Sequence, residues 1–315
     1  ELLGKDHHNL SINEAVAATQ DTFFNAVLYV WVYVQLVFLA WCAYVVATHT
    51  LSVLNYIGFC VSVGLVTGGL GITVAHELGH KTAYADRLHA KILLMTVCYM
   101  HFYVAHNRGH HVWVATPKDA ATSRLGENFY SFWLRTVIGS WQEAWYLEQE
   151  RLQKKNIAVW SWENEMVKAM VFPLLLATTI FVLLSLWQGV WVYEWLLFFV
   201  FQSIIAFSLL ELVNYIEHYG ILRKEIAPNK YEKVNPLHSW NANQLLSNLF
   251  LFQLQRHSDH HANALKPYQT LNDMPDSPQL PAGYPVMILV ALFPPLWFRL
   301  MNPRLQQWRF SQQTI

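Results

Sequence analysis

A single stretch without charged residues limits what this chain can fold into more than any other feature. No Asp, Glu, Lys or Arg occurs in the 54 residues from Thr22 to Ala75. That is more than twice the length of about 20 residues that an α-helix needs to cross a lipid bilayer. Charged residues make up only 13% of the chain, which is about half of their usual share in soluble domains. We therefore expect an all-α, polytopic membrane protein.

The composition also excludes several other classes of protein. A soluble enzyme, a disordered chain and a collagen-like fibre do not have this composition, and 21 Lys and Arg balanced by 21 Asp and Glu leave no basic surplus for nucleic acid. The three cysteines, Cys42, Cys60 and Cys98, each stand alone in an apolar stretch. Without a C-x-x-C pair they predict no disulfide framework, zinc ribbon or iron–sulfur site. We interpret them as core or lipid-facing residues.

The apolar pattern predicts at least four spanning helices, arranged as two hairpins with very short turns. The spans are expected at residues 22–47, 53–75, 167–188 and 190–213. Two other apolar runs, 92–105 and 284–298, are too short to span comfortably, and Pro294 and Pro295 interrupt the second. We expect both runs to be interfacial or re-entrant pieces packed against the bundle.

The distribution of Lys and Arg predicts the orientation of these spans. The two short turns contain neither residue, whereas residues 76–165 hold ten and residues 214–280 hold six. Under the positive-inside rule the two long segments face the cytoplasm. We expect residues 1–315 to form a single integral membrane catalytic domain. Residues 1–21 are polar and carry no signal-peptide pattern, and the abrupt start predicts that N-terminal spans are missing from this sequence.

Histidine is the unusual residue, with fifteen in the chain, and three clusters of it fall in the segments expected to be cytoplasmic. In each cluster two histidines are four residues apart, which on an α-helix places both imidazoles on one face. Each cluster can therefore chelate a metal, and a fourth histidine site follows the last span. The clusters are His76 and His80, then His106, His110 and His111, then His257, His260 and His261, with His218 as the fourth site.

Nine histidines exceed what one metal ion can hold and suit two metals with four or five imidazoles each. Imidazole alone does not choose among zinc, copper, iron and nickel. His76, Glu77 and His80 also match H-E-x-x-H, the zinc-protease helix in which the glutamate is the general base. Such a protease uses one metal with three protein ligands, which leaves six of the nine histidines unexplained. A zinc protease, a metal carrier and ordinary core histidines remain alternative interpretations.

Taken together, the motifs resemble the membrane alkane 1-monooxygenases, the rubredoxin-dependent di-iron alkane hydroxylases. The resemblance runs from about residue 70 to nearly the end of the chain. NYIEHYG favours this family over the fatty-acid desaturases, whose histidine-rich sites have other spacings, and Ala105 stands where the family usually has an acidic residue. The matching motifs are HELGHK, HNRGHH, VATPKDAATSRLGE, NYIEHYG, HSWNANQLLSN, LQRHSDHH and PAGYP.

The resemblance implies two histidine-bound irons that activate O2 and hydroxylate the terminal methyl of medium-chain n-alkanes to 1-alkanols. It also implies electrons from rubredoxin, with rubredoxin reductase upstream, six spans in the whole protein, and a bacterial inner (plasma) membrane with the site at the cytoplasmic side. A related hydroxylase or desaturase of fatty-acyl or aromatic methyl substrates would share these metals. The implied ligands are His76, His80, His106, His110, His111, His218, His257, His260 and His261.

Two further sets of residues follow from this interpretation, although no residue is assigned as the catalytic acid or base. Carboxylates that accept the second N–H of a ligating ring fix its tautomer and offset the charge of the metals. The candidates are Glu77, Asp119, Glu217, Asp259 and Asp273. A small acidic rubredoxin would dock on basic residues of the cytoplasmic face. The candidates for that surface are Arg108, Arg124, Lys154 and Lys155.

Overall fold

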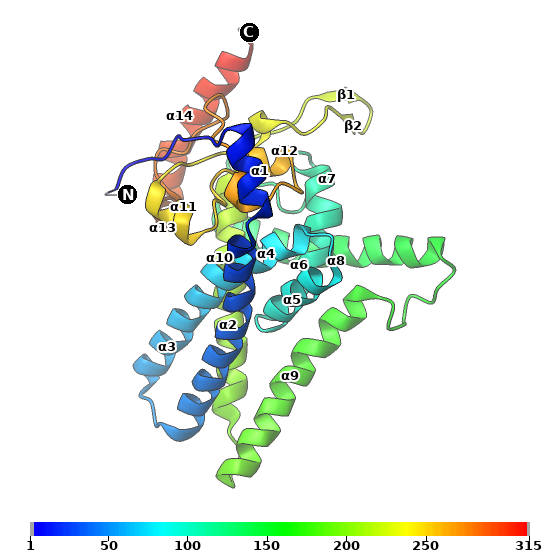
Figure 1. The fold of residues 1–315 in the computed structure, drawn as a ribbon, viewed down its shortest axis with the longest axis vertical. Coiled ribbons are helices and arrows are strands. Elements are labelled where there is room, and N and C mark those ends of the chain that lie inside the picture. The colour runs from blue at the N-terminus through cyan, green and yellow to red at the C-terminus, as the bar shows by residue number, and fades with distance from the viewer. Residues whose placement is uncertain (1–2, 314–315) are drawn as a thin grey trace. The chain divides into compact units, whose positions relative to one another are not determined.

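Helices dominate the structure, a computed structural model that describes residues 3–313 (Figure 1). A two-stranded antiparallel hairpin, β1 and β2, is the sheet found within those residues. The bounds are α1 Ile12–Gln20, α2 Thr22–Thr48, α3 Val53–Val66, η1 Thr67–Ile72, α4 Thr73–His80, α5 Tyr84–Met95, α6 Phe102–Val104, η2 Ala105–His110, α7 His111–Trp113, α8 Phe129–Lys154, α9 Glu165–Gln188, α10 Tyr193–His218, β1 Glu225–Ala227, β2 Lys230–Tyr231, η3 Pro236–His238, α11 Leu245–Phe250, α12 His257–Ala262, η4 Tyr268–Thr270, α13 Tyr284–Ala291 and α14 Pro294–Gln313.

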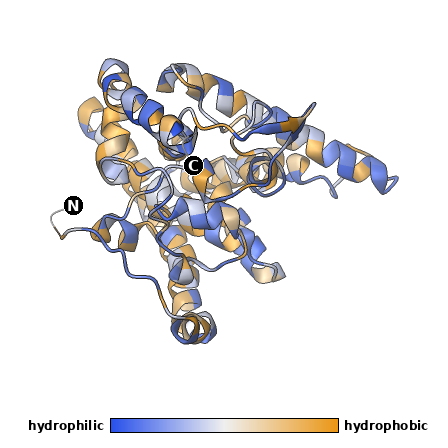
Figure 2. Cartoon of the chain, turned by 90° about the horizontal axis from the view of Figure 1, so that it is seen from above, coloured by the Kyte–Doolittle hydropathy of each residue, from blue (hydrophilic) through white to orange (hydrophobic). Residues whose placement is uncertain are grey.

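Four helices in the described part of the chain are long and apolar enough to cross a membrane, which confirms the four predicted spans. Their bounds are Thr22–Thr48, Val53–His80, Glu165–Gln188 and Tyr193–His218. The second span does not end at residue 75 as expected. No proline interrupts the chain there, so the helix continues through the first histidine cluster and ends where Lys81 becomes extended. In Figure 2 much of the helical ribbon is hydrophobic, whereas many connecting loops are hydrophilic.

The chain divides into two compact units. Unit 1 contains the residues up to Asp21, then Asn107–Ser140 and the residues from Glu211 onward. Unit 2 contains Thr22–His106 and Trp141–Leu210, and therefore most of the four spans. Neither unit is a continuous stretch of sequence. The histidines within one unit therefore come from distant parts of the chain.

The core of unit 2 joins α2, α3, α9 and α10 through buried aliphatic and aromatic side chains. Two glycines allow the second span to approach α10 closely: a Cβ at Gly64 would lie 2.6 Å from the Cβ of Ile205, and one at Gly68 would lie 2.7 Å from the carbonyl oxygen of Ala206. Such contacts between small residues are typical of helix packing in membranes. The core residues include Leu39, Cys42, Cys60, Val63, Trp195 and Phe198.

A buried polar group also lies inside the spans of unit 2. Gln202 accepts a hydrogen bond from the Thr67 hydroxyl at 3.0 Å and donates to the carbonyl oxygen of Thr96 at 2.9 Å, while Gln35 donates to the hydroxyl of Thr96 at 2.9 Å. Polar side chains in lipid need such partners because no water is available there. They fix the position of Thr67, the first residue of η1. This π-helical segment precedes the histidines of α4.

The run expected at 92–105 is not one helix. It falls on the end of α5, a turn, and α6, so its interfacial position stays a prediction. In unit 1 the run at 284–298 is broken as expected: α13 and α14 meet at an angle of 120° on either side of the prolines. This bent pair is a broken span or a re-entrant loop, and counting it gives up to five candidate spans.

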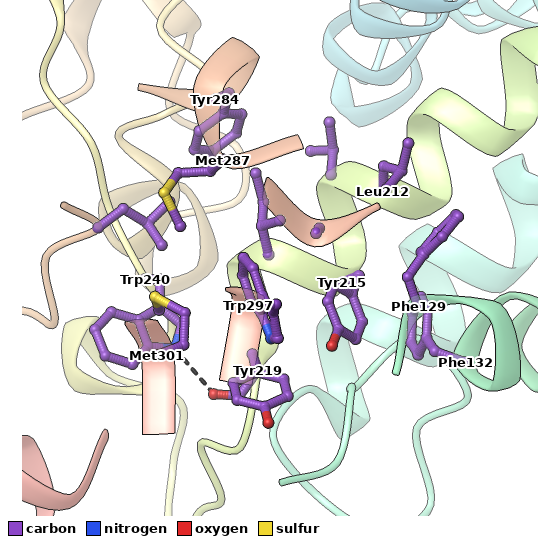
Figure 3. Packing of buried hydrophobic residues seen from close by; sticks show 14 of the residues in the cluster. Phe129, Phe132, Leu212, Tyr215, Tyr219, Trp240, Tyr284, Met287, Trp297 and Met301 are labelled. Atoms are coloured by element: carbon purple, nitrogen blue, oxygen red, sulfur yellow. Dashed lines mark hydrogen bonds between the residues drawn. The ribbon is translucent and has the colours of Figure 1, made fainter. Parts of the chain in front are cut away.

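The core of unit 1 packs α13 and α14 against the end of α10 (Figure 3). Tyr215 and Tyr219, one turn apart on the last turns of α10 and just beyond it, both contact the buried Trp297 ring, with centroids 5.0 and 5.2 Å away. The indole N–H of Trp240 donates to the carbonyl oxygen of Tyr219 at 2.9 Å. These contacts fix the chain on both sides of His218, and α10 ends there because Gly220 takes a left-handed conformation.

Candidate metal centre

Four buried histidines of unit 1 form the first group, here called the quartet: His110, His218, His257 and His261. They come from the end of η2, the last residue of α10 and two successive turns of α12. The Nε2 atom of His257 lies 3.2 Å from Nε2 of His218 and 2.9 Å from Nε2 of His261. One ligand atom from each of the four rings lies within 4.8 Å of those from the others.

The donor atoms of the quartet fit a metal better than they fit each other. A ring nitrogen carries either one hydrogen or one lone pair, yet Nε2 of His257 has three close neighbours, the third being Oε2 of Glu217 at 3.2 Å. Two nitrogens that each lie about 2.0–2.1 Å from one metal are roughly 2.9–3.4 Å apart at octahedral to tetrahedral angles. The observed separations lie in that range, so a central cation would accept all of these lone pairs.

Burial also favours the neutral, metal-binding form of these rings. The pKa of His261 lies well below its ordinary value because the ring is buried and because the other histidines, His257 first, surround it. A neutral imidazole has the free lone pair that a metal needs. His261 can therefore bind a cation without first releasing a proton.

A second group lies in unit 2 and consists of His76, His80 and His106. Nε2 of His80 lies 3.2 Å from Nε2 of His76 and 3.1 Å from Nε2 of His106. His76 and His80 share one face of α4, as their spacing predicts. In unit 1 the two remaining predicted ligands, His111 and His260, form a pair with their Nε2 atoms 3.1 Å apart. All nine predicted histidines thus lie in close histidine contacts.

One expectation about the clusters is wrong. His106 and His110 are four residues apart but do not act as a pair, because His106 belongs to the group of α4 whereas His110 belongs to the quartet. Both lie in η2, a π-helical segment with more residues per turn than an α-helix. The assumption of a regular α-helix, on which the expected pairing of the two rings rests, therefore does not hold at this cluster.

Asp119 forms a hydrogen bond with one ring of the quartet, at the nitrogen that is not its candidate metal-binding atom. Its Oδ2 accepts a hydrogen bond from Nδ1 of His110 at 2.8 Å, which leaves Nε2 of that ring as the lone-pair nitrogen. The same oxygen accepts from the Thr122 hydroxyl at 2.6 Å, and Oδ1 accepts from the backbone N–H of Ala121 at 2.9 Å. Burial raises the pKa of Asp119, but the charge and hydrogen bond of His110 and the bond from Thr122 outweigh it, so the pKa lies below its ordinary value.

Glu217 takes a different position from Asp119. Its Oε2 faces Nε2 of His257, the nitrogen on the inner side of the quartet, rather than the outer nitrogen of a ring. Its other oxygen accepts from the hydroxyl of Tyr284 at 2.7 Å. This buried carboxylate can offset the charge of a bound cation directly. Sequence reasoning missed Tyr284 and Thr122, which orient these two carboxylates; PAGYP contributed to the resemblance without assigning Tyr284 a role.

The other three candidate carboxylates lie elsewhere. Asp259 is buried on α12 but forms an ion pair with Lys266 at 2.5 Å and bonds to Asn263 and to the backbone of Asn272. Asp273 bonds to Asn243 and His7. Glu77 is buried on α4 between the two histidines of that helix.

The basic residues and cysteines predicted from the sequence are also placed. Arg124, Lys154 and Lys155 are exposed, and Arg108 is half-buried on η2. Cys42 and Cys60 are buried in the core of unit 2, in agreement with their interpretation as core residues, and all three cysteines are free thiols.

Comparison with known proteins places this chain in a family. The family model described as "Fatty acid desaturase" matches residues 51–291. Alkane 1-monooxygenase 1 of Alcanivorax borkumensis is 41% identical over 98% of this chain and 74% of its own length. Alkane 1-monooxygenase 2 of Pseudomonas aeruginosa is 44% identical over 87% of this chain and 71% of its own length. The chain belongs to the alkane 1-monooxygenase family.

A more distant relative marks the breadth of the family's chemistry. The xylene/toluene monooxygenase hydroxylase component XylM of Pseudomonas putida is 28% identical over 81% of this chain. The resemblance seen in the histidine motifs is therefore confirmed. The matched regions of both alkane 1-monooxygenases cover most of the chain, so the family relationship includes the spans as well as the histidine segments.

Proposed function

We propose that this protein is an alkane 1-monooxygenase, which hydroxylates the terminal methyl of medium-chain n-alkanes with O2. The observation that carries the proposal is the buried quartet with its converging Nε2 atoms, in a chain whose relatives named alkane 1-monooxygenase are 37–44% identical. The balanced reaction converts R–CH3, O2, two electrons and two protons into R–CH2OH and water. One oxygen atom enters the C–H bond, and the other is reduced to water.

We propose two irons, held by the nine histidines. The quartet of unit 1 supplies four ligands for one iron. The other predicted ligands are His76, His80 and His106 in unit 2 and His111 and His260 in unit 1. When bound, the irons supply the activation of dioxygen, whereas the protein supplies positioning and exclusion of water. Asp119 keeps Nε2 of His110 available as a ligand, and Glu217 offsets positive charge beside His257.

The electron donor and the membrane placement belong to the same proposal. Rubredoxin delivers the two electrons at exposed basic residues, for which Arg124 in unit 1 and Lys154 and Lys155 in unit 2 are candidates. The protein lies in the inner membrane of a bacterium. Because Lys and Arg are concentrated in the segments that carry the histidines, the metal centre faces the cytoplasm. At high salt the rate of electron delivery should fall, since attraction between exposed charges is screened.

Metal analysis of the purified, detergent-solubilised protein tests the proposal first. About two irons and little zinc per chain support it, and about one zinc overturns it. The His257→Ala variant should lose iron and turnover, whereas His49→Ala, in the exposed turn between α2 and α3, should retain both. A fully loaded and active His257→Ala protein would contradict the ligand set.

Product analysis separates the substrate classes. With rubredoxin and its reductase, n-alkanes of graded length should give 1-alkanols as the main products. A clear preference for the methyl groups of toluene or xylene would instead favour the alternative of an aromatic methyl hydroxylase, in line with the relative named xylene/toluene monooxygenase. Proteolysis that depends on Glu77 would identify the zinc-protease alternative, and the Glu77→Gln variant tests for it.

A further inference from the structure

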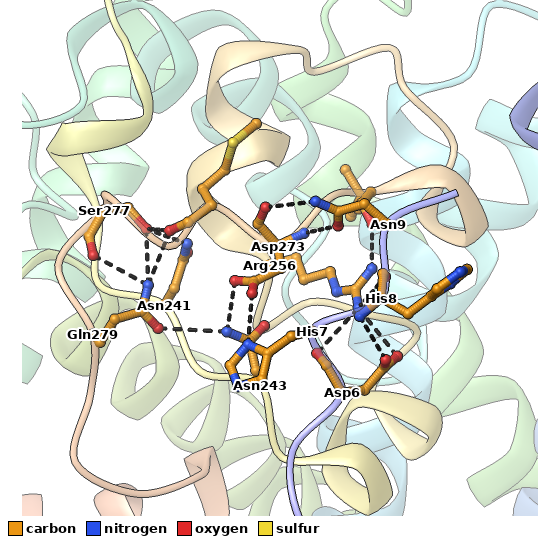
Figure 4. Close-up of polar contacts among 12 residues, drawn as sticks. Asp6, His7, His8, Asn9, Asn241, Asn243, Arg256, Asp273, Ser277 and Gln279 are labelled. Carbon is orange, nitrogen blue, oxygen red and sulfur yellow. Dashed lines mark hydrogen bonds and ion pairs between the residues drawn. The ribbon is translucent and has the colours of Figure 1, made fainter. Parts of the chain in front are cut away.

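The polar residues before the first span contact residues 243–273, the part of the chain that contains His257, His260 and His261 (Figure 4). The backbone N–H of Asp6 donates to the carbonyl oxygen of Asn243 at 2.8 Å, and that of Leu245 donates to Gly4 at 3.1 Å. Lys5 and Gln244 form an antiparallel bridge between the same two strands of chain. Residues 4–9, here called the clasp, thus run along residues 243–245 as an extended segment.

The clasp ends on Asp273 rather than in solvent. Asn9 and Asp273 exchange two hydrogen bonds, the Nδ2 atom of Asn9 donating to the carbonyl oxygen of Asp273 at 3.0 Å and the backbone N–H of Asp273 donating to Oδ1 of Asn9 at 2.6 Å. The Asp273 carboxylate contacts Nδ1 of His7 at 2.7 Å and accepts from Nδ2 of Asn243 at 2.7 Å. The contacts of Asp273 with His7 and Asn9 join residues more than 260 positions apart.

Arg256 connects the clasp to the metal-binding helix. It is the residue directly before His257 and the first residue outside α12. Its Nη2 lies 3.1 Å from the Asp6 carboxylate and donates to the carbonyl oxygen of His8 at 3.1 Å, while Nη1 donates to the carbonyl oxygen of Leu271 at 2.6 Å. Only 5% of Arg256 is exposed. Its guanidinium is thus bound from two sides by chain segments outside α12.

We propose that the clasp, through Asp6 and Arg256, positions α12 and so determines how firmly the quartet holds its metal. Two physical reasons support this. α12 is only six residues long and cannot fix its own direction, because so short a helix is marginal without tertiary contacts. In addition, Arg256 places a buried positive charge one residue from a ligand of a cation, and the Asp6 carboxylate offsets that charge.

The inference rests on the proposed function only in treating the quartet as a metal site. Arg256 and Asp6 are positioning residues, since neither contacts the ring of a quartet histidine through any of the bonds described here. Asp273, expected from the sequence to support a ligand, acts instead as the far anchor of the clasp.

The test compares Asp6→Asn and Arg256→Lys with Glu14→Gln, an acid-to-amide change in the same N-terminal region. Within residues 3–313 the Glu14 carboxylate accepts a hydrogen bond from Ser11 and takes part in none of the contacts of Asp6, Asn9 or Arg256 described above. Full-length protein in detergent is loaded with iron and exposed to a chelator. We expect both clasp variants to release one of two irons about tenfold faster than the wild type, as changes to residues that support metal ligands do. The other iron and the control variant should be unaffected, and the double variant should resemble the single ones.

Hydrogen exchange of the α12 amides provides a second reading that needs no metal. Both clasp variants should exchange these amides faster than wild type, and Glu14→Gln should not. If both variants release iron and exchange the α12 amides at wild-type rates, the proposal that the clasp positions α12 is wrong. If the wild-type protein binds no iron, the proposed function is wrong instead, and hydrogen exchange still tests whether the clasp positions α12. If Arg256→Lys does not fold, Asp6→Asn decides alone, because Arg256 keeps its backbone partners in that variant.

Discussion

Replacing Asp119 by asparagine tests whether the carboxylate behind His110 sets the metal affinity of the quartet. The change keeps the size of the side chain and removes its charge. If the asparagine oxygen takes the place of Oδ2, it can accept from both His110 and Thr122, which now donate to Oδ2 at 2.8 and 2.6 Å, but the NH2 group then faces the backbone N–H of Ala121, which now donates to Oδ1. In either orientation the NH2 group has no lone pair, so at least one bond is lost together with the charge.

The magnitude follows from two independent estimates. Loss of an outer partner of a metal-bound histidine typically lowers metal affinity about 10–100-fold, which corresponds to about 1.4–2.8 kcal/mol. A hydrogen bond to a charged group contributes about 1.5–3 kcal/mol. Because Asp119 is buried, with 2% of its surface exposed, solvent cannot replace the lost acceptor. We therefore expect one of the two irons to bind 10–100-fold more weakly.

Chelator competition on the purified protein measures this affinity, with Asp276→Asn as the control because Asp276 is exposed in the same unit. Thr122→Val separates the two bonds, since it removes one donor and leaves the bond to His110. Its effect should be the smaller of the two. Wild-type affinity in Asp119→Asn would refute the reasoning, and an equal loss in Asp276→Asn would show that the effect is not local.

Three other predictions follow from buried contacts. Tyr284→Phe removes the hydroxyl that donates to Glu217 at 2.7 Å, and should lower thermal stability by about 1–3 kcal/mol together with turnover; unchanged melting and turnover would contradict a role for this bond. Gly68→Ala places a Cβ 2.7 Å from a backbone oxygen of α10 and should destabilise by about 1–3 kcal/mol, whereas Gly58→Ala, with open space around it, should not; both are measured by thermal unfolding. Burial lowers the pKa of His101 from 6.5 to about 3, so the unfolded state binds a proton that the folded state does not. Melting temperature should then fall as the pH drops from about 6.5 towards 3, less so in His101→Phe, and equal pH profiles for the two proteins would refute it.

The four spans could be predicted from the sequence because the bilayer acts on each segment separately. Length and apolarity alone make residues such as those from Thr22 to Thr48 a candidate span. The end of the second span was harder to predict, because polar residues such as His76 and Glu77 lower the hydropathy although the helix continues to His80. Hydropathy reports the lipid boundary of a helix, not its last residue.

The site was predictable where it depends on helical period and not where it depends on long-range packing. His76 and His80, and likewise His257 and His261, share a face because their α-helices are regular. His106 and His110 have the same spacing but belong to different groups of histidines, and only the fold shows this. Among the acids, Asp119 and Asp273 look alike in sequence, and only the fold shows that one contacts His110 whereas the other contacts His7.

The π-helical segment η1, which precedes α4 in the second span, has a consequence for changes in chain length. A π-helical turn accommodates about one residue more than an α-helical turn while the flanking helix stays in place. Deleting one residue between Thr67 and Ile72 should therefore restore a regular α-helix, which is more stable locally. Because the flanking helix stays in place, His76 and His80 should still face His106 after that deletion. Deleting one residue from the regular helix α3 would instead rotate everything beyond it by about 100° and turn both histidines away from His106. The π-helical turn is therefore a place where the second span can lose a residue without disrupting this group of histidines.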